Sequence, residues 1–149
     1  MLSRTVEYAL RAIVCLANES PAPQTNDQLA RVTQVPPAYL PKIMLSLNRA
    51  GLVRSQRGPN GGFTLAIEPD KLSLLEVVNA VDPIQRIHTC PLDLKGHNTN
   101  LCPLHRRLDD TLATVERAFR ETTLADVLSE STGSVPLCSD EQQQIVELK

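Results

Sequence analysis

The segment Arg54-Ser55-Gln56-Arg57-Gly58-Pro59-Asn60-Gly61-Gly62-Phe63-Thr64-Leu65-Ala66-Ile67 has the pattern of two short strands joined by a tight turn. The Asn60-Gly61 pair favours the positive backbone angles of a two-residue hairpin turn. Arginine and glutamine side chains lie at the mouth of this hairpin, with no acidic residue near them. The apolar side of the hairpin is supplied by Val53, Phe63, Leu65 and Ile67. We therefore predict a basic β-hairpin over residues 54–67.

Two short helices are predicted immediately before the hairpin. Thr25 and Gln28 have the spacing of a capping box, which marks the start of the first helix. The prolines at 36 and 37 end that helix and suit the first turn of the next, which we place at 36–50 with Gly51 ending it. The predicted buried residues are Leu29, Ala30 and Val32 in the first helix, and Leu40, Ile43, Met44 and Leu47 in the second.

The remaining elements are helical, so the fold class is mainly α with one small β-hairpin. Apolar spacings of three and four predict an amphipathic helix over 3–17. Ser73 and Glu76 cap a helix that extends to about residue 80, and a closing helix at 124–128 starts after Thr122 or Thr123. We divide the chain into a winged helix-turn-helix at 1–82, a cysteine- and histidine-bearing loop at 83–100, a long helix with the closing helix at 101–128, and a polar tail at 129–149. We expect that tail to be mobile, with some helix near 142–148.

Charge is distributed unevenly along the chain. Residues 28–67 contain five basic and no acidic residues, whereas residues 109–149 contain nine acidic and three basic ones. A locally basic segment suits a polyanion-binding face even though the net charge is −2. An ordinary solvated basic surface is the alternative.

A helix pair followed by a basic hairpin indicates a winged helix-turn-helix that reads double-stranded DNA. The second helix fits the major groove, and the hairpin lies on phosphates or in the minor groove. Four to six phosphate contacts would give a log–log salt slope of roughly −4 to −5 per protomer. The candidate DNA-contacting residues are Thr25, Pro37, Ala38, Tyr39, Lys42, Arg49, Arg54, Gln56, Arg57 and Asn60.

The predicted helix at 101–121 carries one continuous apolar stripe, which is more than a small domain needs for its own core. The stripe consists of Leu104, Leu108, Leu112, Val115 and Phe119. Because a winged-helix reader normally acts as two copies on a two-fold operator, we predict a homodimer with this helix as its main interface. An ordinary intramolecular core helix is the alternative.

Cysteine usage and hydropathy indicate a cytoplasmic protein. Four cysteines are too few for a disulfide scaffold of 149 residues, no secretion signal is evident, and no apolar run approaches the ~20 residues that span a bilayer. Cys90 and Cys102 lie in or beside the 83–100 loop as candidate metal ligands or redox thiols, whereas Cys15 is predicted to be core. The sequence lacks a zinc-type C-x-x-C pair and a nucleophile–base pair, which disfavours an enzyme. Besides a DNA-binding regulator and an enzyme, the third functional class is a purely structural interaction module.

Several motifs in order resemble the Rrf-two family of transcriptional regulators. They are Val6-Glu-Tyr-Ala-Leu-Arg-Ala12, Tyr39-Leu-Pro-Lys-Ile43, Ala50-Gly-Leu-Val53, Arg57-Gly-Pro-Asn-Gly-Gly62, Leu72-Ser-Leu-Leu-Glu-Val77 and Thr123-Leu-Ala-Asp-Val127. The resemblance extends to about Leu128. It implies a dimeric DNA-binding regulator, usually a repressor, with winged-helix readers and a long dimer helix.

The same resemblance implies a cysteine-based sensor, with one departure from the family pattern. Sensing members carry three cysteines with five residues between successive ones; here Cys90 and Cys102 match the outer positions, and Gly96 occupies the middle one. His105 follows Cys102 by three, like the ligand histidine of IscR-like members. Glu7 lies where NsrR-like members have a carboxylate ligand from the other subunit, although an intrahelical pair with Arg11 is an alternative.

The implied cofactor is an iron–sulfur cluster of the 2Fe-2S or 4Fe-4S type. The candidate ligands are Cys90, Cys102, His105 and Glu7 of the other subunit, with His97 as a weaker candidate in place of His105. Iron–sulfur clusters accept some non-cysteine ligands. The function expected is a repressor that senses iron–sulfur, nitric oxide or redox status. The alternative is a clusterless regulator that uses a thiol switch, a small ligand or a partner protein.

Overall fold

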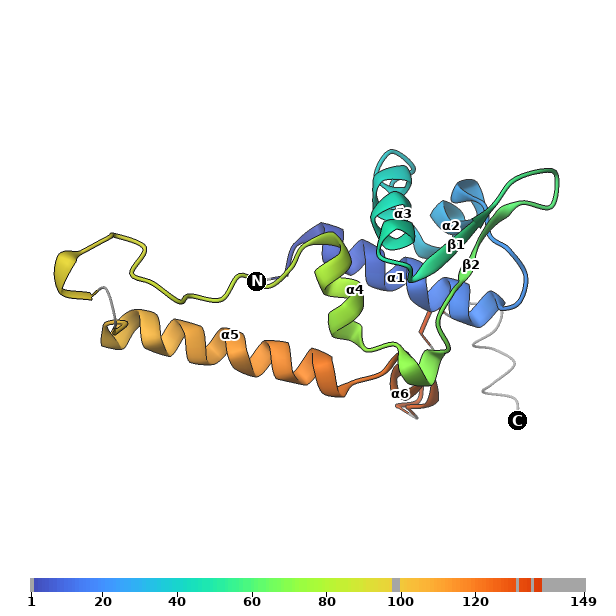
Figure 1. The fold of residues 1–149 in the computed structure, drawn as a ribbon. Helices are drawn as coiled ribbons and strands as arrows, with labels where there is room; N and C mark the ends of the chain where they lie inside the picture. The colour runs from blue at the N-terminus through green and yellow to red at the C-terminus, as the bar shows by residue number, and fades with distance from the viewer. Residues whose placement is uncertain (1, 98–99, 131, 135, 138–149) are drawn as a thin grey trace.

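The computed structural model has a head of short elements and a long arm (Figure 1). It describes residues 2–97, 100–130, 132–134 and 136–137. The elements are α1 (Arg4–Glu19), α2 (Asn26–Thr33), α3 (Leu40–Arg49), β1 (Val53–Gln56), β2 (Gly62–Leu65), the 3-10 turn η1 (Pro69–Lys71), α4 (Leu74–Val81), the 3-10 turn η2 (Lys95–His97), α5 (Pro103–Glu121) and α6 (Leu124–Ser129). We call α1–α4, the hairpin and α6 the head, and α5 with residues 83–97 the arm. The predicted class, mainly α with a small hairpin, is confirmed.

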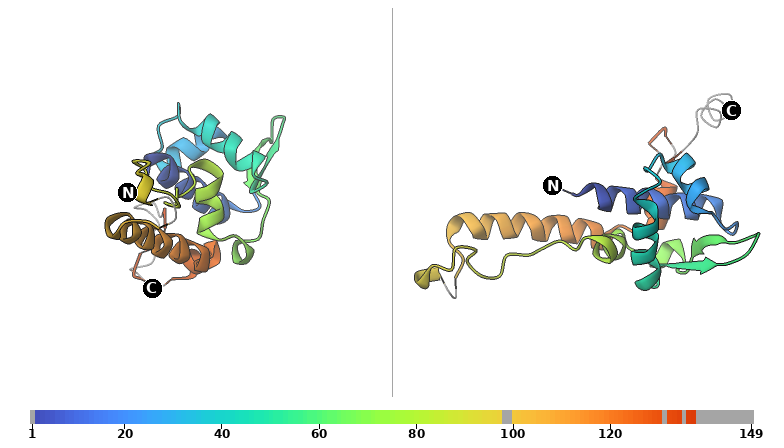
Figure 2. Two further views of the ribbon diagram at one scale, coloured as in Figure 1. Left: turned by 60° about the vertical axis from the view of Figure 1, so that its left-hand side comes forward. Right: turned by 90° about the horizontal axis from the view of Figure 1, so that it is seen from above.

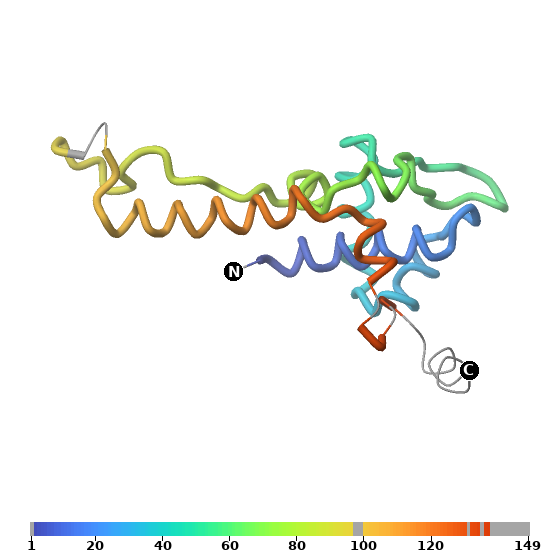
Figure 3. Tube along the Cα trace, turned by 90° about the horizontal axis from the view of Figure 1, so that it is seen from below, coloured from blue at the N-terminus to red at the C-terminus, as the bar shows by residue number. Residues whose placement is uncertain are grey.

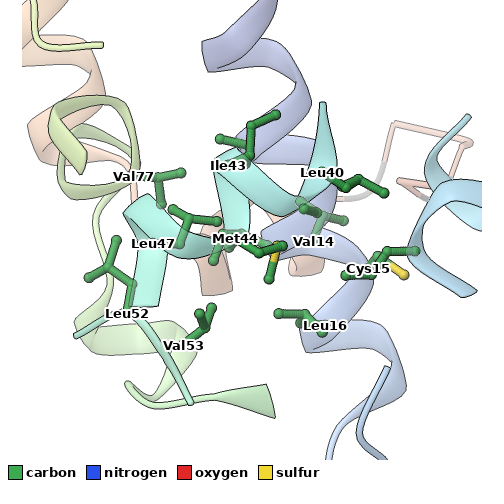
Figure 4. Close-up of a cluster of buried hydrophobic side chains, with 14 of the residues drawn as sticks. Val14, Cys15, Leu16, Leu40, Ile43, Met44, Leu47, Leu52, Val53 and Val77 are labelled. Carbon is green, nitrogen blue, oxygen red and sulfur yellow. The ribbon is translucent and has the colours of Figure 1, made fainter. Parts of the chain in front are cut away.

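The core of the head is built around α1. Its apolar positions recur every three or four residues, so one face of the helix is continuously buried. α2, α3, α4 and β2 all pack against α1. Figure 4 shows α3 side chains turned toward α1 and toward the start of the hairpin. The fully buried side chains include Ile13, Leu16, Leu29, Leu40, Met44, Leu47, Leu72 and Leu124.

Three capping boxes set the starts of α2, α4 and α6. Thr25 with Gln28, and Ser73 with Glu76, form the two predicted boxes, and Thr123 with Asp126 forms the third. Thr123 rather than Thr122 is therefore the cap of the closing helix. Leu74 N donates to the Thr122 carbonyl at 2.9 Å, and Leu124 N donates to the Leu72 carbonyl at 2.8 Å. These two backbone bonds hold the segment after α5 against the segment that enters α4, so that the chain after the arm packs on the head.

Two details of the helix pair differ from prediction. The second helix begins at Leu40 rather than at residue 36, because residues 37–39 form a turn closed by a 3.0 Å bond from Tyr39 N to the Pro36 carbonyl. Proline disfavours helical angles in the residue before it, so Pro37 opposes a helical conformation at Pro36. Tyr39, the N-cap residue of α3, makes no capping hydrogen bond with its side chain. Val32 was predicted to be buried but is 43% exposed, whereas Thr33 is buried. The Thr33 hydroxyl is satisfied by the Leu29 carbonyl at 2.6 Å.

The hairpin turn also differs from prediction. β1 and β2 pair antiparallel with Gln56 opposite Gly62, so five residues, not two, connect the strands. Positive φ angles occur at Gly58 (106°) and Gly62 (138°) rather than at Asn60-Gly61. Beyond the turn, Phe63 N donates to the Gln24 carbonyl at 2.8 Å, and Gln24 N donates to the Phe63 carbonyl at 3.0 Å. The hairpin is thereby joined to the segment that enters α2.

The arm extends away from the head. Residues 83–97 run beside α5 in the opposite direction (Figures 1 and 3). Only the C-terminal part of α5 lies alongside the first half of α1 when the molecule is seen from above (Figure 2). The predicted long helix at 101–121 is confirmed with a start at Pro103. Within the described residues no helix is long and apolar enough to cross a bilayer. The predicted helix near 142–148 lies outside the described residues, and the mobility of the tail stays a prediction; in its described part, Asn18 Nδ2 donates to the Pro136 carbonyl at 3.1 Å.

Candidate functional site

The turn before α3 and the first turn of α3 form one exposed surface. Pro37, Ala38 and Tyr39 are exposed in the turn, and Lys42 is exposed one helical turn later. The Tyr39 ring packs edge-on against the Tyr8 ring, with 5.7 Å between the ring centroids. This contact fixes the turn on α1, so that Lys42 and the turn keep a defined orientation.

Arg11 joins three elements behind this surface. Its Nη1 donates to the Thr33 carbonyl at the end of α2 at 3.2 Å, and its guanidinium lies 5.7 Å from the Tyr8 ring centroid. Its Nε and Nη2 also donate to Glu7 Oε1, at 3.0 and 2.5 Å. Within one chain Glu7 therefore forms the intrahelical pair that the sequence offered as the alternative to metal ligation.

The hairpin supplies the second exposed surface. Arg54, Gln56, Arg57 and Asn60 are all exposed, on β1 and on the five-residue connection. Figure 1 places the hairpin and α3 in the head, on the side away from the arm. The bonds to Gln24 hold the hairpin against the helix pair, so both surfaces belong to one rigid unit.

The basic side chains of these two surfaces lack acidic partners. Among residues 2–97, 100–130, 132–134 and 136–137, Lys42, Arg49, Arg54 and Arg57 form no ion pair; the same holds for Arg106, Arg107 and Arg117 of α5, whereas Arg11, Arg86 and Arg120 are paired. What sets the head surfaces apart is that residues 28–67 contain no acidic side chain, which is what a polyanion-binding face requires. The structure thus brings the predicted DNA-contacting residues into the head. The Thr25 hydroxyl already accepts a hydrogen bond from Gln28 N as the cap of α2, so this side chain also has a structural role.

The other candidate site lies at the far end of the arm. Cys102 is the N-cap residue of α5, and its Sγ lies 3.2 Å from Nδ1 of His105, one turn into the helix. Cys90 is buried, with 9% of its surface exposed. Over the described part of the chain, no three His, Cys, Asp or Glu side chains form a group that could hold a metal ion. The structure therefore brings Cys102 and His105 together, and it does not bring Cys90 or Glu7 of the same chain into a set of three.

The weaker candidate His97 and the other two cysteines are placed differently. The His97 side chain and Cys138 lie outside the described residues. Cys15 is fully buried in α1, as predicted. Burial, and secondarily Glu19, raise the pKa of the Cys15 thiol to about 11, so this thiol stays protonated in the core.

Sequence reasoning missed the contact that holds the loop on α5. Asp109 accepts hydrogen bonds from Arg86 Nε and Nη2, both at 2.7 Å, and from Ile87 N at 2.8 Å. Glu116 lies 3.7 Å from Arg86 Nη1. We call Arg86, Ile87 and Asp109 the loop clamp. A separation of 22 or 23 residues leaves no local pattern in the sequence, so only the fold reveals it.

An apolar groove of about 590 Å³ opens where the arm meets the head. It lies between the N-terminal turn of α1, residues 82–85 and the middle of α5. Leu112 and Val115 of the predicted stripe line one side, and Leu2 and Val6 line the other. No residue of α5 is buried, and Leu104, Leu108 and Val115 are 64%, 47% and 36% exposed. Three of the five residues of the stripe are thus exposed in the single chain, whereas Leu112 and Phe119 are half-buried.

A helix pair, a hairpin joined to it and a basic face define a winged helix-turn-helix protein with a long helical arm. Residues 2–130 match the model of the Rrf2 family, described as iron-dependent transcriptional regulators, and the chain belongs to that family. Proteins of this family are transcriptional regulators that bind DNA and are not enzymes.

Relatives and solved structures agree with this assignment. The chain is 30% identical over 132 residues to a candidate HTH-type transcriptional regulator of Aquifex aeolicus, covering 87% of this chain and 92% of the relative. It is 34% identical over 131 residues to one of Mycobacterium tuberculosis, covering 85% and 80%. The structure of T. potens IscR superposes with a TM-score of 0.70 at 22% identity, over 86% of this chain and 85% of that one. The structure of CymR, the global cysteine regulator of B. subtilis, superposes with a TM-score of 0.69 at 26% identity, over 85% and 95%.

Proposed function

We propose that this regulator is a homodimeric repressor that reads DNA with α3 and the hairpin and senses a signal at the far end of the arm. The reading surface is the exposed, unneutralised basic face of the head. The expected base-reading segment is the turn at 37–39 with Lys42, and the hairpin arginines are expected to lie on phosphates.

The dimer proposal rests on the exposed part of the α5 stripe. Three large apolar side chains of this helix are 36–64% exposed, and burying that remaining surface would stabilise an interface by roughly 0.5–2 kcal/mol for each. The neighbouring groove between α1 and α5 continues the same apolar surface. Pairing through α5 would couple the far ends of the arms to the spacing of the two readers.

The sensing proposal rests on the Cys102–His105 contact. A cysteine sulfur and an imidazole nitrogen side by side are a mixed donor pair of the kind that iron–sulfur clusters accept. Cys90, Cys102 and His105 of one subunit, with Glu7 of the partner subunit, would hold the cluster. A bound cluster would supply a redox-active, nitric-oxide-reactive group. For Glu7 to serve through Oε1, Arg11 must release that oxygen, because Arg11 Nε and Nη2 both donate to it.

A clusterless thiol switch at Cys90 and Cys102 is the second candidate. It is favoured by the 26% identity to CymR, the global cysteine regulator of B. subtilis, and by the glycine at position 96, where the family pattern has a third cysteine.

Anaerobic purification followed by visible absorbance and iron and sulfide analysis separates the two candidates. The cluster proposal expects a coloured, iron-containing protein that loses colour in Cys102→Ala and His105→Ala but keeps it in Cys15→Ala. A colourless, iron-free protein whose DNA affinity changes on thiol oxidation would replace the cluster with the thiol switch.

DNA reading is tested on its own by selecting duplexes from a random library. Arg57→Ala and Lys42→Ala should weaken binding to the selected duplex, and Arg57→Ala should reduce the salt slope by about one unit. Arg120→Ala on α5 is the matched control. An unchanged affinity and slope in both head variants would refute the assignment of this face.

A further inference from the structure

The outward face of α3 carries an exposed leucine between two basic residues. At about 100° per residue, positions 42, 45 and 49 of a helix point away from the side that positions 40, 43, 44 and 47 share. Those four residues are buried against α1 and the hairpin (Figure 4), whereas Lys42, Leu45 and Arg49 are exposed. Leu45, 47% exposed, therefore lies on the face that points away from the core, between Lys42 and Arg49 along the helix axis.

The charged residues around Leu45 restrict the kind of surface that this face of α3 can bind. Lys42 precedes it by three residues and Arg49 follows it by four, so both cations are on the same face of the helix. Residues 28–67 contain no acidic side chain. A surface that complements this face must be anionic around its edges and offer an apolar group at its centre. The major groove of B-DNA has that composition, with phosphates along its rims and the methyl groups of thymine on its floor.

We propose that Leu45 is a specificity-determining residue that contacts the C5 methyl group of a thymine in the operator. The inference rests on the proposed function, in which α3 lies in the major groove. A leucine side chain neither donates nor accepts a hydrogen bond, so it cannot read the polar edge of a base. The methyl group of thymine is the apolar feature of the base edges in the groove. Leu45 thus selects thymine at one position in each half-site, while Lys42 and Arg49 supply the polar and phosphate contacts.

Thymine-to-deoxyuridine substitution tests this contact, because it removes only the methyl group and keeps base pairing. Duplexes are first selected from a random library with the wild-type protein, and each thymine of the selected site is then replaced in turn by deoxyuridine. One replacement per half-site should lower wild-type affinity about fourfold for each lost methyl contact. Leu45→Ala should bind the two duplexes equally and keep the wild-type salt slope. Leu45→Met, which stays apolar, should regain the methyl dependence.

Asn48→Ala, at an exposed position on the flank of α3, is the matched control and should keep the full methyl dependence. Circular dichroism and thermal unfolding check that Leu45→Ala folds like the wild type. The inference is overturned if every deoxyuridine duplex gives the same affinity ratio with wild type and with Leu45→Ala. If the wild-type protein retains no duplex from the library, the proposed function fails as well, which distinguishes that failure from one confined to Leu45.

Discussion

Asp109 is the residue on which the position of the arm's loop depends. The two bonds from the Arg86 guanidinium, followed by the bond from Ile87 N, lower the pKa of the Asp109 carboxyl from 3.8 to about 2. The bidentate Arg86 contact is partly shielded, because the two side chains are 28% and 15% exposed. Ile87 is three residues before Cys90. The loop clamp therefore sets where the cysteine-bearing loop meets α5.

Asp109→Asn should loosen the loop without unfolding the head. The amide keeps the shape of the side chain but loses its charge, and an NH2 group replaces the oxygen that accepts from Arg86 Nη2. The bonds from Arg86 Nε and Ile87 N to the remaining oxygen lose their charge assistance. Hydrogen exchange over 83–90 should become several-fold faster, and the Cys90 thiol should react faster with a thiol reagent. Asp110→Asn changes a neighbouring exposed acid and should alter neither rate. Equal exchange in the two variants would contradict the clamp.

The clamp should also depend on pH in a predictable direction. A carboxyl whose pKa is lowered in the folded state contributes stability above its unfolded pKa and loses it as pH falls through the folded pKa. The contribution of Asp109 should therefore be complete above about pH 4 and be lost toward pH 2. A carboxyl titration by NMR should give a midpoint near 2, and the Ile87 amide shift should follow it. A midpoint near 3.8 would show that the contact does not persist in solution.

At the scale of the elements, the junction between the hairpin and the helix pair depends on Gly62. A Cβ atom at this position would lie 2.7 Å from the backbone carbon and oxygen of Gln24, and the φ of Gly62 is +138°. Both features follow from the paired bonds between Gln24 and Phe63. The hairpin is therefore oriented by backbone contact with the entry to α2 as well as by side-chain packing.

Gly62→Ala should destabilise the protein by about 2–4 kcal/mol, because the methyl group collides with backbone that cannot move without breaking the Gln24 bonds. Gly58→Ala is the matched control: its φ is +106°, but nothing lies within 4 Å of the added Cβ. It should show only the backbone strain, about 1–2 kcal/mol. Urea unfolding measures both. Equal losses would show that backbone strain alone, and not the contact with Gln24, requires glycine at 62.

For the whole molecule, the exposed part of the α5 stripe is the surface on which the proposed dimer depends. The arm extends beyond the head (Figures 1 and 2), and the apolar side of α5 continues into the groove beside α1. A second copy placed there would cover both surfaces. It would also set two DNA-reading faces at a fixed spacing.

Leu108→Glu should break the proposed dimer, because it places a charge in the middle of the stripe where the interface excludes water. Sedimentation should show a shift toward monomer, and DNA affinity should fall as the second half-site contact is lost. Arg117→Glu on the opposite side of α5 should leave the assembly unchanged. A wild-type protein that sediments as a monomer would refute the dimer, and a dimeric Leu108→Glu would exclude this face as its centre.

The elements that the sequence predicted well are those set by neighbouring residues. The capping boxes at Thr25 and Ser73 and the amphipathic stripes of α1, α3 and α5 depend on groups three or four positions apart. The errors came where a distant contact competed with a local preference. Asn60-Gly61 favours a two-residue turn. In the structure β2 also bonds to Gln24, and the two strands pair with Gln56 opposite Gly62, which leaves a five-residue connection.

The sequence by itself determined the class of the fold, the basic head and the unusually long apolar stripe, because periodicity and charge are local properties. Only the tertiary structure decided how far Leu45 is exposed on the outward face of α3, that Cys102 contacts His105 while Glu7 is held by Arg11, and that Asp109 clamps the loop. The exposure of Leu45 and the Asp109 clamp depend on how segments far apart in the chain pack together. Cys102 and His105 are three residues apart and Glu7 and Arg11 are four apart, but the sequence leaves other partners open to each. The side-chain geometry of the folded chain selects among these partners.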